Sequence, residues 1–466
     1  MTTSTAERRA RERERRMTLT TLASAGSRAV SVLVNLATVP LALHYLGAEQ
    51  YGIWLVLTSA MAWLAFAQLG VAPSLLNHLA ASEGRADGAR GAGLVATAWW
   101  LQVASAGGLI VILMALLPFL PLRALLNAGE GVDLAAVRDA AVLLWLGFLL
   151  ALPIQVATAV FQAKQEGYLA HGWDLLRSFL RLGGIVVAVR ADLGIQGLAA
   201  AYAFAPLVAG VASTIHLFGR RHRSLAPRPG QVSRLWVGPL LRTGLQFTGL
   251  TLGALIISYT DNIVIAQVLG PIQVPPYAVT FMLAQLFIML EMIVLDAAWP
   301  AYVEAAARGD GDWVRRTHVR LVRVSLAGAL ASGVALLLLG RPVIRLWAGA
   351  DAVPSMALLA VMALLIGVQS VQLCYGRLTT ALGAVRTNML LGLANAAINL
   401  PVSILLARSI GLPGVALGTV IGYAVIAVPL IVLSTKALNA LNPRSHGASS
   451  PEQPGSRLAG EMIVHP

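Results

Sequence analysis

The sequence predicts an all-α integral membrane protein with about twelve transmembrane helices in two six-helix lobes and both termini in the cytoplasm. Three observations support this fold class. Of the 466 residues, 57% are hydrophobic and only 12% are charged, about half the charge of ordinary soluble domains. The apolar residues fall into long blocks that can each cross a bilayer as a helix of ~20 residues. The connecting loops differ in their content of basic residues, and the sequence repeats weakly at a spacing of about 220.

Twelve apolar segments follow one another along the chain. At 1.5 Å of rise per residue, most of them match or exceed the ~30 Å hydrocarbon core of a bilayer. The fifth segment is the weakest, because Asp174, Arg177 and Arg181 interrupt it. The segments lie near residues 20–46, 51–80, 93–118, 137–162, 172–190, 196–218, 237–268, 276–302, 320–340, 355–375, 386–407 and 413–436.

The basic residues indicate the orientation of these segments. With the N-terminus inside, 27 of the 34 Lys and Arg residues lie on the cytoplasmic side and six lie in outer loops, as the positive-inside rule requires. Arg28 stands apart, near the inner end of the first segment. The arginine-rich residues 1–17 precede an apolar segment too long for the apolar part of a signal peptide. We therefore expect a multi-pass membrane protein with a cytoplasmic N-terminus.

A weak internal repeat divides the chain into two halves. Residues 46–50 (LGAEQ) recur as 269–273 (LGPIQ) at an offset of 223, and residues 193–199 recur as 410–416 at an offset of 217. Each half holds six segments, so the two halves have the same orientation in the membrane, an arrangement found in transporters. The predicted parts are a basic cytoplasmic arm (1–17), an N-terminal lobe (18–219), a cytoplasmic linker (220–236), a C-terminal lobe (237–437) and a polar, disordered tail (438–466).

Catalytic and nucleotide-binding motifs are missing from the sequence. It has no G-x-x-x-x-G-K-[ST] loop and no H-E-x-x-H motif, and its only cysteine, Cys374, excludes a disulfide framework or a cysteine zinc cage. A net charge of +13 could suggest nucleic acid, but most of this charge is explained by membrane orientation. We expect a non-enzymatic protein with no metal, no resident cofactor and no nucleic-acid partner.

Buried ionisable residues are costly in a membrane and are therefore candidates for function. Asp261 lies about eight residues before the outer turn at Leu269, and Glu291 lies near the centre of the next segment. At the repeat offset of 223, Glu291 aligns with Gln68, so both lobes carry a polar residue at this depth. We expect Asp261 and Glu291 to be coupling or cavity carboxylates. The alternative is that they are structural carboxyls satisfied by neighbouring hydroxyls.

Three arginines are candidates for binding an anionic substrate. Arg28 begins the apolar run of the first segment, and Arg177 and Arg181 are four residues apart, on one face of a helix. An arginine in a membrane cavity would suit a pyrophosphate group, which it can contact with two parallel hydrogen bonds. The alternative for all three is contact with lipid headgroups.

Several short motifs resemble the polysaccharide-exporter (Wzx-like) flippases of the multidrug/oligosaccharidyl-lipid/polysaccharide (MOP) superfamily, whose fold is MATE-like. The resemblance spans roughly residues 18–437. At Gln68 the sequence departs from the pattern, because many relatives have Asp before Leu-Gly, so a proton-linked role there is doubtful. The motifs are residues 46–54 (LGAEQYGIW), 68–70 (QLG), 261–262 (DN) before 269–270 (LG), 299–302 (WPAY) and 307–310 (ARGD).

The resemblance implies a transporter with two six-helix lobes around a cavity that opens alternately to each side. Its cargo would be an undecaprenyl-pyrophosphate-linked oligosaccharide of O-antigen, capsule or exopolysaccharide, moved from the cytoplasmic to the periplasmic leaflet. We expect Arg28, Arg177, Arg181 and Gln68 to contact this substrate, with coupling to H⁺ or Na⁺. A polysaccharide polymerase and chain-length proteins are expected partners. The alternative is a cation-coupled multidrug or metabolite antiporter of the same superfamily.

Overall fold

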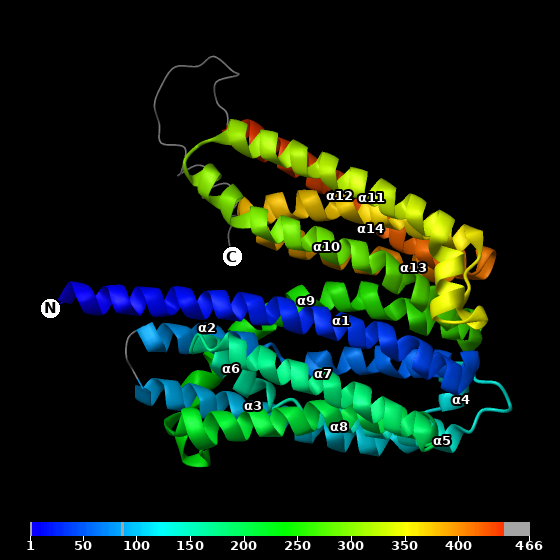
Figure 1. The fold of residues 1–466 in the computed structure, drawn as a ribbon, viewed down its shortest axis with the longest axis horizontal. Helices are drawn as coiled ribbons and strands as arrows, with labels where there is room; N and C mark the ends of the chain where they lie inside the picture. Colours follow the sequence, from blue (N-terminus) through cyan, green and yellow to red (C-terminus); the bar gives the residue numbers. More distant parts are fainter. Residues whose placement is uncertain (1, 85–87, 442–466) are drawn as a thin grey trace. The chain divides into compact units, whose positions relative to one another are not determined.

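The structure is a computed structural model that describes residues 2–84 and 88–441. Within these ranges, the side chains of 2–14, 16, 17, 83, 84, 88, 250–254, 256–258, 297 and 300 are not described. The described chain is helical and contains no strand (Figure 1). Of the predicted tail, residues 438–441 belong to the last helix, and residues 442–466 lie outside the described part.

The chain divides into two compact units, one formed by Met1–Leu255 with Gly270–Ile272 and the other by Ile256–Leu269 with Gln273–Pro466. The N-terminal unit contains α1 (Thr2–Trp63), η1 (Leu64–Gln68), α2 (Val71–Gly84), α3 (Gly88–Leu116), α4 (Leu122–Leu126), α5 (Leu134–Leu150), α6 (Gln155–Ala163), α7 (Gly167–Arg190), α8 (Gly194–Ile215) and the first part of α9 (Arg234–Leu269). The C-terminal unit contains the rest of α9, then α10 (Val274–Ala307), α11 (Gly311–Trp347), α12 (Met356–Ala381), α13 (Val385–Ile410) and α14 (Leu412–Leu441).

The described helices are those of a multi-pass membrane protein. Nine helical stretches of the described chain are long and apolar enough to cross a membrane. The first, Thr18–Ser82, includes two of the predicted segments, 20–46 and 51–80. Neither α7, which carries the charges noted above, nor α9 is among the nine. The total of twelve crossings and the cytoplasmic location of both termini therefore stay predictions.

The repeat seen in the sequence is present in the backbone conformation. Gly47 and Gly270, at the same position of the first repeated motif, have φ angles of 75° and 93°. Gly194 and Gly411, in the second motif, have φ angles of 62° and 70°. Glycine is favoured at such angles because it has no Cβ. The two halves thus turn at equivalent glycines.

The predicted segment 51–80 is not one continuous helix. It is interrupted at Leu64–Gln68, which form a 3₁₀ turn between α1 and α2. Side chains of α3 satisfy two carbonyl groups of this interruption: Ser105 Oγ donates to one at 2.7 Å and Gln102 Nε2 to the other at 2.9 Å. Such partners are needed because an unsatisfied carbonyl is costly within a bilayer. Apolar side chains of α2, α3 and α6 form the core beside it.

We expect Gly70→Ala to destabilise the protein strongly. Gly70 follows the interruption with a φ of +58°, and a Cβ built on it would lie 2.0 Å from the backbone oxygen of Gly244 in the first half of α9. The strained backbone alone costs ~1–3 kcal/mol, and the clash adds to it. Thermal unfolding of the detergent-solubilised protein measures the effect. The control is Gly107→Ala in α3, where a Cβ meets nothing within 4 Å. Equal melting temperatures for both variants would contradict this packing.

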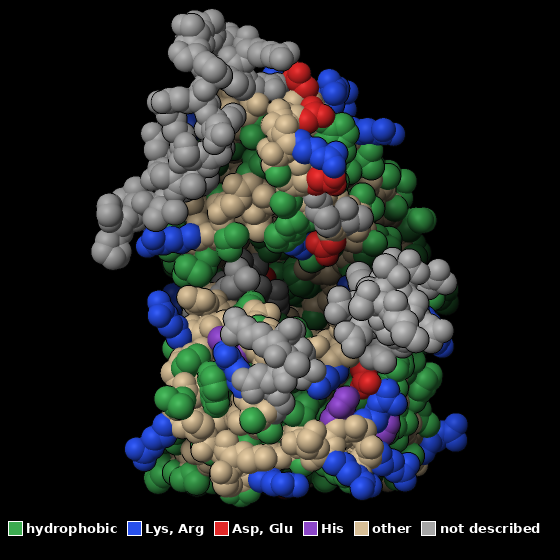
Figure 2. All heavy atoms as spheres, turned by 90° about the vertical axis from the view of Figure 1, so that its left-hand side faces the viewer, with side chains coloured by type: hydrophobic (Ala, Val, Ile, Leu, Met, Phe, Trp, Pro, Cys, Tyr) green, Lys and Arg blue, Asp and Glu red, His purple; other side chains and the backbone are tan. Residues whose placement is uncertain are grey.

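A buried carboxylate holds the beginning of the α8–α9 connection. Glu166, whose side chain is 6% exposed, lies in the turn between α6 and α7. Arg221 Nη2 donates to its Oε1 at 2.8 Å, and His222 Nε2 lies 3.2 Å from its Oε2. Lys and Arg side chains gather around this end of the N-terminal unit (Figure 2). Glu166 thus provides a fixed attachment point for a connection that is otherwise strongly basic.

The stability of this attachment should depend on pH. Burial alone would raise the pKa of Glu166, but the hydrogen bonds from Arg221 and His222 hold that pKa below its usual value of 4.5. A lowered pKa contributes stability above the unfolded-state pKa, and this stability is lost as the pH falls through the folded-state pKa. We expect the melting temperature of the wild type to fall steeply below pH 4.5, and that of Glu166→Gln to be lower at neutral pH and less pH-dependent.

The matched control for Glu166 is Glu304→Gln. Glu304 is 63% exposed and pairs with Arg308 one turn later on the surface of α10. An exposed pair of this kind contributes only ~0–1 kcal/mol. Thermal unfolding between about pH 3 and about pH 7, a range that includes the transition of a buried carboxylate and the neutral plateau, measures both variants. Identical curves for the two would show that Glu166 does not stabilise the attachment.

Candidate functional site

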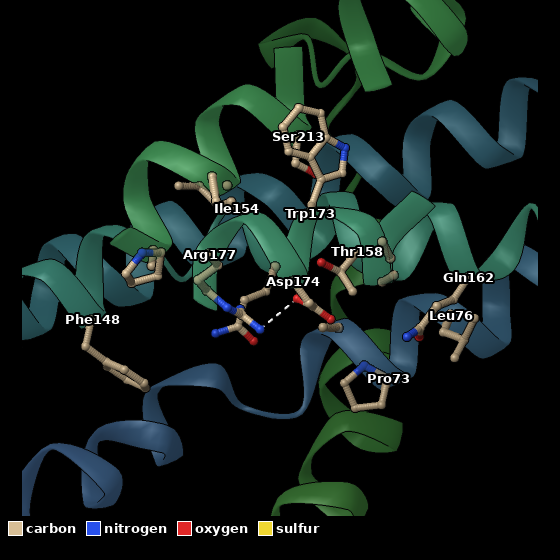
Figure 3. Close-up of a pocket in the computed structure, with 18 of the residues that line it drawn as sticks. Pro73, Leu76, Phe148, Ile154, Thr158, Gln162, Trp173, Asp174, Arg177 and Ser213 are labelled. Atoms are coloured by element: carbon tan, nitrogen blue, oxygen red, sulfur yellow. Dashed lines mark hydrogen bonds and ion pairs between the residues drawn. The ribbon is translucent and has the colours of Figure 1, made fainter. Parts of the chain in front are cut away.

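A cavity of about 510 Å³ lies inside the N-terminal unit (Figure 3). This size is typical of sites that bind small molecules, ~300–1,000 Å³. Side chains from α1, α2, α5, α6, α7 and α8 form its wall, which is apolar on the side of α2 and α5. The polar and aromatic lining residues are Phe148, Gln155, Thr158, Gln162, Trp173, Asp174, Arg177, Tyr202 and Ser213.

Arg177 is the only cationic residue among the described residues of this lining, and its neighbour Asp174 orients it. One turn apart on α7, the two form an ion pair with 2.7 Å between Arg177 Nη2 and Asp174 Oδ1 (Figure 3). His171 Nδ1 lies 3.5 Å from the other oxygen of Asp174. A guanidinium has five N–H donors. Among the described residues, Arg177 bonds only Asp174, so most of its donors are available to an anion in the cavity.

Arg181 lies one turn further along α7, behind the cavity wall. Its Nη2 donates to Asn35 Oδ1 on α1 at 2.7 Å. Its guanidinium carbon lies 5.1 Å from the ring centre of Tyr202, a lining residue of α8. This geometry is that of a cation–π contact. Arg181 therefore joins α1, α7 and α8 and fixes the position of the Tyr202 ring.

Arg28 and Gln68, the other two predicted substrate residues, also lie outside the lining. Arg28 is exposed on α1, and no partner is found for it among the described side chains. Gln68 lies in the interruption before α2, where its carbonyl accepts from Gln102. The structure thus places Arg177 in the cavity lining and Arg181 behind it against Tyr202, and leaves Arg28 and Gln68 apart from both.

The sequence left some of the lining residues without an assigned role. Trp173 and Tyr202 had none, and Asp174 was noted only because it interrupts an apolar segment. A signal for the opposite wall was present, because Gln155, Thr158 and Gln162 have the i, i+3, i+7 spacing of one helix face. In the structure these three side chains line the cavity from α6. No pattern within one segment could show that α6 faces α7.

The C-terminal unit holds a buried polar cluster around Asp261, which is 3% exposed on α9. Tyr277 of α10 donates its hydroxyl hydrogen to Asp261 Oδ2. Thr419 Oγ1 of α14 donates to the same oxygen at 3.1 Å and accepts from Asn399 Nδ2 of α13 at 2.9 Å. Four helices therefore converge on one carboxylate.

Several polar atoms of this cluster have no hydrogen-bond partner within the described chain. They are Thr260 Oγ1, Asp261 Oδ1, Asn399 Oδ1 and both polar atoms of the Asn395 side chain. Buried polar atoms are normally paired, so each unpaired one needs an explanation such as an ion or a water. Carboxylate and amide oxygens suit a hard cation or a proton. The described residues contain no group of three His, Cys, Asp or Glu side chains that could hold a metal ion.

Glu291 lies in a different cluster, formed by α10, α11 and α12. Ser370 Oγ donates to its Oε2 at 2.6 Å, and Cys374 Sγ donates to its Oε1 at 3.7 Å. Cys374 also lies 3.3 Å from Ser325 Oγ. Ser370 thus satisfies one oxygen of Glu291, and the other oxygen has only the weak thiol of Cys374, whose single hydrogen it shares with Ser325. One oxygen of Asp261 has no donor in the described chain. The two carboxylates that the sequence grouped together have different surroundings.

The comparisons with known proteins agree with the resemblance seen in the sequence. No family model matches the chain. The chain is 24% identical over 299 residues to the "Putative O-antigen transporter" of Salmonella typhi, and the match covers 64% of this chain and 66% of that protein, just under two thirds of its length. The described helices also resemble solved structures of MATE transporters.

Two of these structures illustrate the likeness. An inward-facing multidrug resistance MATE transporter of the MOP superfamily has a TM-score of 0.74 at 17% identity, covering 90% of this chain and 96% of that chain. A MATE protein in complex with MaD3S has a TM-score of 0.64 at 16% identity, covering 92% and 97%. The likeness confirms the MATE-like fold. The relatives are transporters, in agreement with the prediction of a non-enzymatic membrane protein.

Proposed function

We propose that the protein is a flippase that moves an undecaprenyl-pyrophosphate-linked oligosaccharide from the cytoplasmic to the periplasmic leaflet by alternating access. The observation that carries this proposal is the cavity of the N-terminal unit. There Arg177, held by Asp174, presents free N–H donors beside amide and hydroxyl side chains and the Trp173 ring. Arginine suits a pyrophosphate, and the amides and hydroxyls suit sugar hydroxyl groups. The name of the Salmonella typhi relative supports the same cargo.

The transport step would be coupled to H⁺ or Na⁺ at Asp261. This carboxylate is buried among four helices and has one oxygen without a donor in the described chain. A bound proton or cation would compensate its charge, and its release would favour a different packing of α9, α10, α13 and α14. Glu291 is the weaker candidate, because Ser370 donates to one of its oxygens and the Cys374 thiol lies near the other.

The cellular setting follows from the cargo. We place the protein in the bacterial inner membrane with both termini in the cytoplasm, as its distribution of basic residues predicts. Polysaccharide polymerase and chain-length proteins would act on the exported unit and are its expected partners. The protein itself needs no resident cofactor for such a step.

Complementation tests the proposal. The full chain is expressed in bacteria that lack their own O-unit flippase, with hosts that make several different repeat units, and surface polysaccharide is measured. Restored polysaccharide in at least one host is the expected result, with the empty vector as control. The same vectors are tested in an efflux-deficient strain. Drug resistance there, together with failure in all the flippase hosts, would replace the flippase by the multidrug antiporter.

A further inference from the structure

The C-terminal unit contains a polar cavity of its own, of about 190 Å³, between α12, α13 and α14. By bulk volume it could hold about six water molecules, the size of one small polar group. Two glycines help to open it, since Gly376 lies on α12 and Gly392 on α13. A Cβ built on Gly392 meets no atom within 4 Å. The polar lining side chains are Gln372, Arg377, Thr380 and Asn388.

Arg377 is held firmly at the wall of this cavity. Its Nη2 lies 2.9 Å from Asp296 Oδ1 on α10, and its guanidinium carbon lies 5.4 Å from the centre of the Trp299 ring, one turn further along α10. The side chain of Arg377 is only 23% exposed. Asp296 and Trp299 thus orient the guanidinium, and in the described chain no other partner takes its remaining donors.

The other polar residues of the cavity define what it can accept. Asn388 and Thr380 bond each other and the backbone oxygen of Gly376, so they form a rigid wall with no free donor. The Gln372 amide has no hydrogen-bond partner among the described residues and can donate to a ligand. The free donors are therefore those of Arg377 and Gln372. A planar guanidinium with an amide beside it fits a phosphoryl oxygen pair.

The same arrangement occurs in the cavity of the N-terminal unit. There Arg177 is held by Asp174, with glutamine and threonine side chains in the lining. The internal repeat does not explain this likeness, because Arg177 and Arg377 are 200 positions apart and the repeated motifs are offset by 217 and 223. Two independent helix packings thus produce an oriented arginine at a polar cavity.

We infer that the Arg377 cavity is a second oxyanion subsite, which takes a phosphoryl group of a lipid-linked ligand. This inference rests on the proposed function for the identity of the natural ligand, the isoprenyl pyrophosphate of the lipid-linked oligosaccharide. A phospholipid headgroup carries the same phosphoryl chemistry. In the sequence, Arg377 counts only as one of the 27 basic residues on the cytoplasmic side, which the positive-inside rule explains by orientation.

Binding of farnesyl pyrophosphate to the purified full-length protein in detergent tests the inference, with calorimetry as the measurement. Gly392→Leu fills the cavity without removing a polar group, and leucine favours a helix over glycine by ~1 kcal/mol, so folding should be preserved. Arg377→Gln is made together with Asp296→Asn, so that no carboxylate is left unpaired. Both proteins should lose affinity on the order of tenfold or more, the usual value of a charge-assisted hydrogen bond.

Two controls separate the sources of binding. Arg408→Gln removes an arginine at the end of α13, outside the cavity lining, and should leave affinity unchanged. In the Arg177→Gln background, Gly392→Leu should weaken the remaining binding further.

Farnesol and phosphatidylglycerol are titrated in parallel. Competition by phosphatidylglycerol at equal concentration would assign the cavity to a lipid headgroup and overturn its assignment to the isoprenyl pyrophosphate.

The inference is overturned if the Gly392→Leu and Arg377→Gln/Asp296→Asn proteins bind farnesyl pyrophosphate as the wild type does. It is also overturned if Arg177→Gln alone abolishes the binding of farnesyl pyrophosphate. The same holds if the wild type binds farnesyl pyrophosphate no more tightly than it binds farnesol. None of these results changes the outcome of complementation in cells. Failure of the second subsite can therefore be distinguished from failure of the flippase function.

Discussion

Replacing Asp261 by Asn is expected to abolish most of the export of surface polysaccharide. Asparagine has nearly the same shape and can still accept from Tyr277 and Thr419, but it cannot exchange a proton or neutralise a cation. If the coupled ion contributes ~1.4 kcal/mol or more to the transport step, its loss reduces the export rate at least about tenfold. Surface polysaccharide in the complemented flippase mutant is the measurement, with the amount of membrane-inserted protein determined on the same cells.

The matched control for Asp261 is Asp351→Asn. Asp351 is exposed in the short 3₁₀ turn between α11 and α12, so its replacement removes the same charge far from any buried cluster. It should export as the wild type does. Normal export by Asp261→Asn at a normal protein level would remove this carboxylate from the mechanism. Glu291→Gln is expected to have the smaller effect, because Ser370 donates to one oxygen of Glu291 and the Cys374 thiol lies near the other.

Replacing Arg177 by Gln is expected to reduce export on the order of tenfold to a hundredfold. The change removes the only cation that lines the cavity of the N-terminal unit and leaves Asp174 with His171 as its remaining partner. A charge-assisted hydrogen bond to a phosphoryl group is worth ~1.5–3 kcal/mol, which corresponds to this range. Two quantities are measured for Arg177→Gln: the export of surface polysaccharide in the complemented flippase mutant, and the affinity of the purified protein for farnesyl pyrophosphate.

Two further variants decide whether the charge or the shape of Arg177 matters. Arg177→Lys keeps the charge but loses the planar fork, so it should export at an intermediate level. Arg190→Gln, at the exposed end of the same helix, should have no effect. If Arg177→Gln exports normally while the thermal stability is unchanged, the cavity does not bind the anionic part of the cargo.

Local sequence patterns were sufficient to predict many of the elements. The apolar segments were visible because each helix must supply a bilayer's length of apolar side chains, whatever it packs against. The glycines of the repeated motifs marked turns that the structure confirms with positive φ angles at Gly47, Gly270, Gly194 and Gly411. The buried acid Asp261 stood out for the same reason, since a charge in an apolar segment is costly and rare.

Other features depend on contacts between distant segments. The interruption at Leu64–Gln68 is satisfied by Gln102 and Ser105 of α3, and nothing within residues 51–80 shows that these partners exist. Arg177 and Arg181 looked alike in the sequence. In the structure one lines a cavity, and the other lies over Tyr202 and bonds Asn35. The difference arises from the neighbours of each side chain, because Asn35 of α1 and Tyr202 of α8 lie beside Arg181.

The sequence by itself determined that this is a multi-pass helical membrane protein with an internal repeat and a few buried polar residues, because these properties are set by the solvent around each segment. Only the tertiary structure decided which polar residues meet. It joined Asp261 to α10, α13 and α14 and gave Glu291 separate partners. It also placed Arg377 at a cavity with Asp296 and Trp299 behind it. Such encounters depend on how helices far apart in the chain pack, and the periodicity of a single helix carries no record of its neighbours.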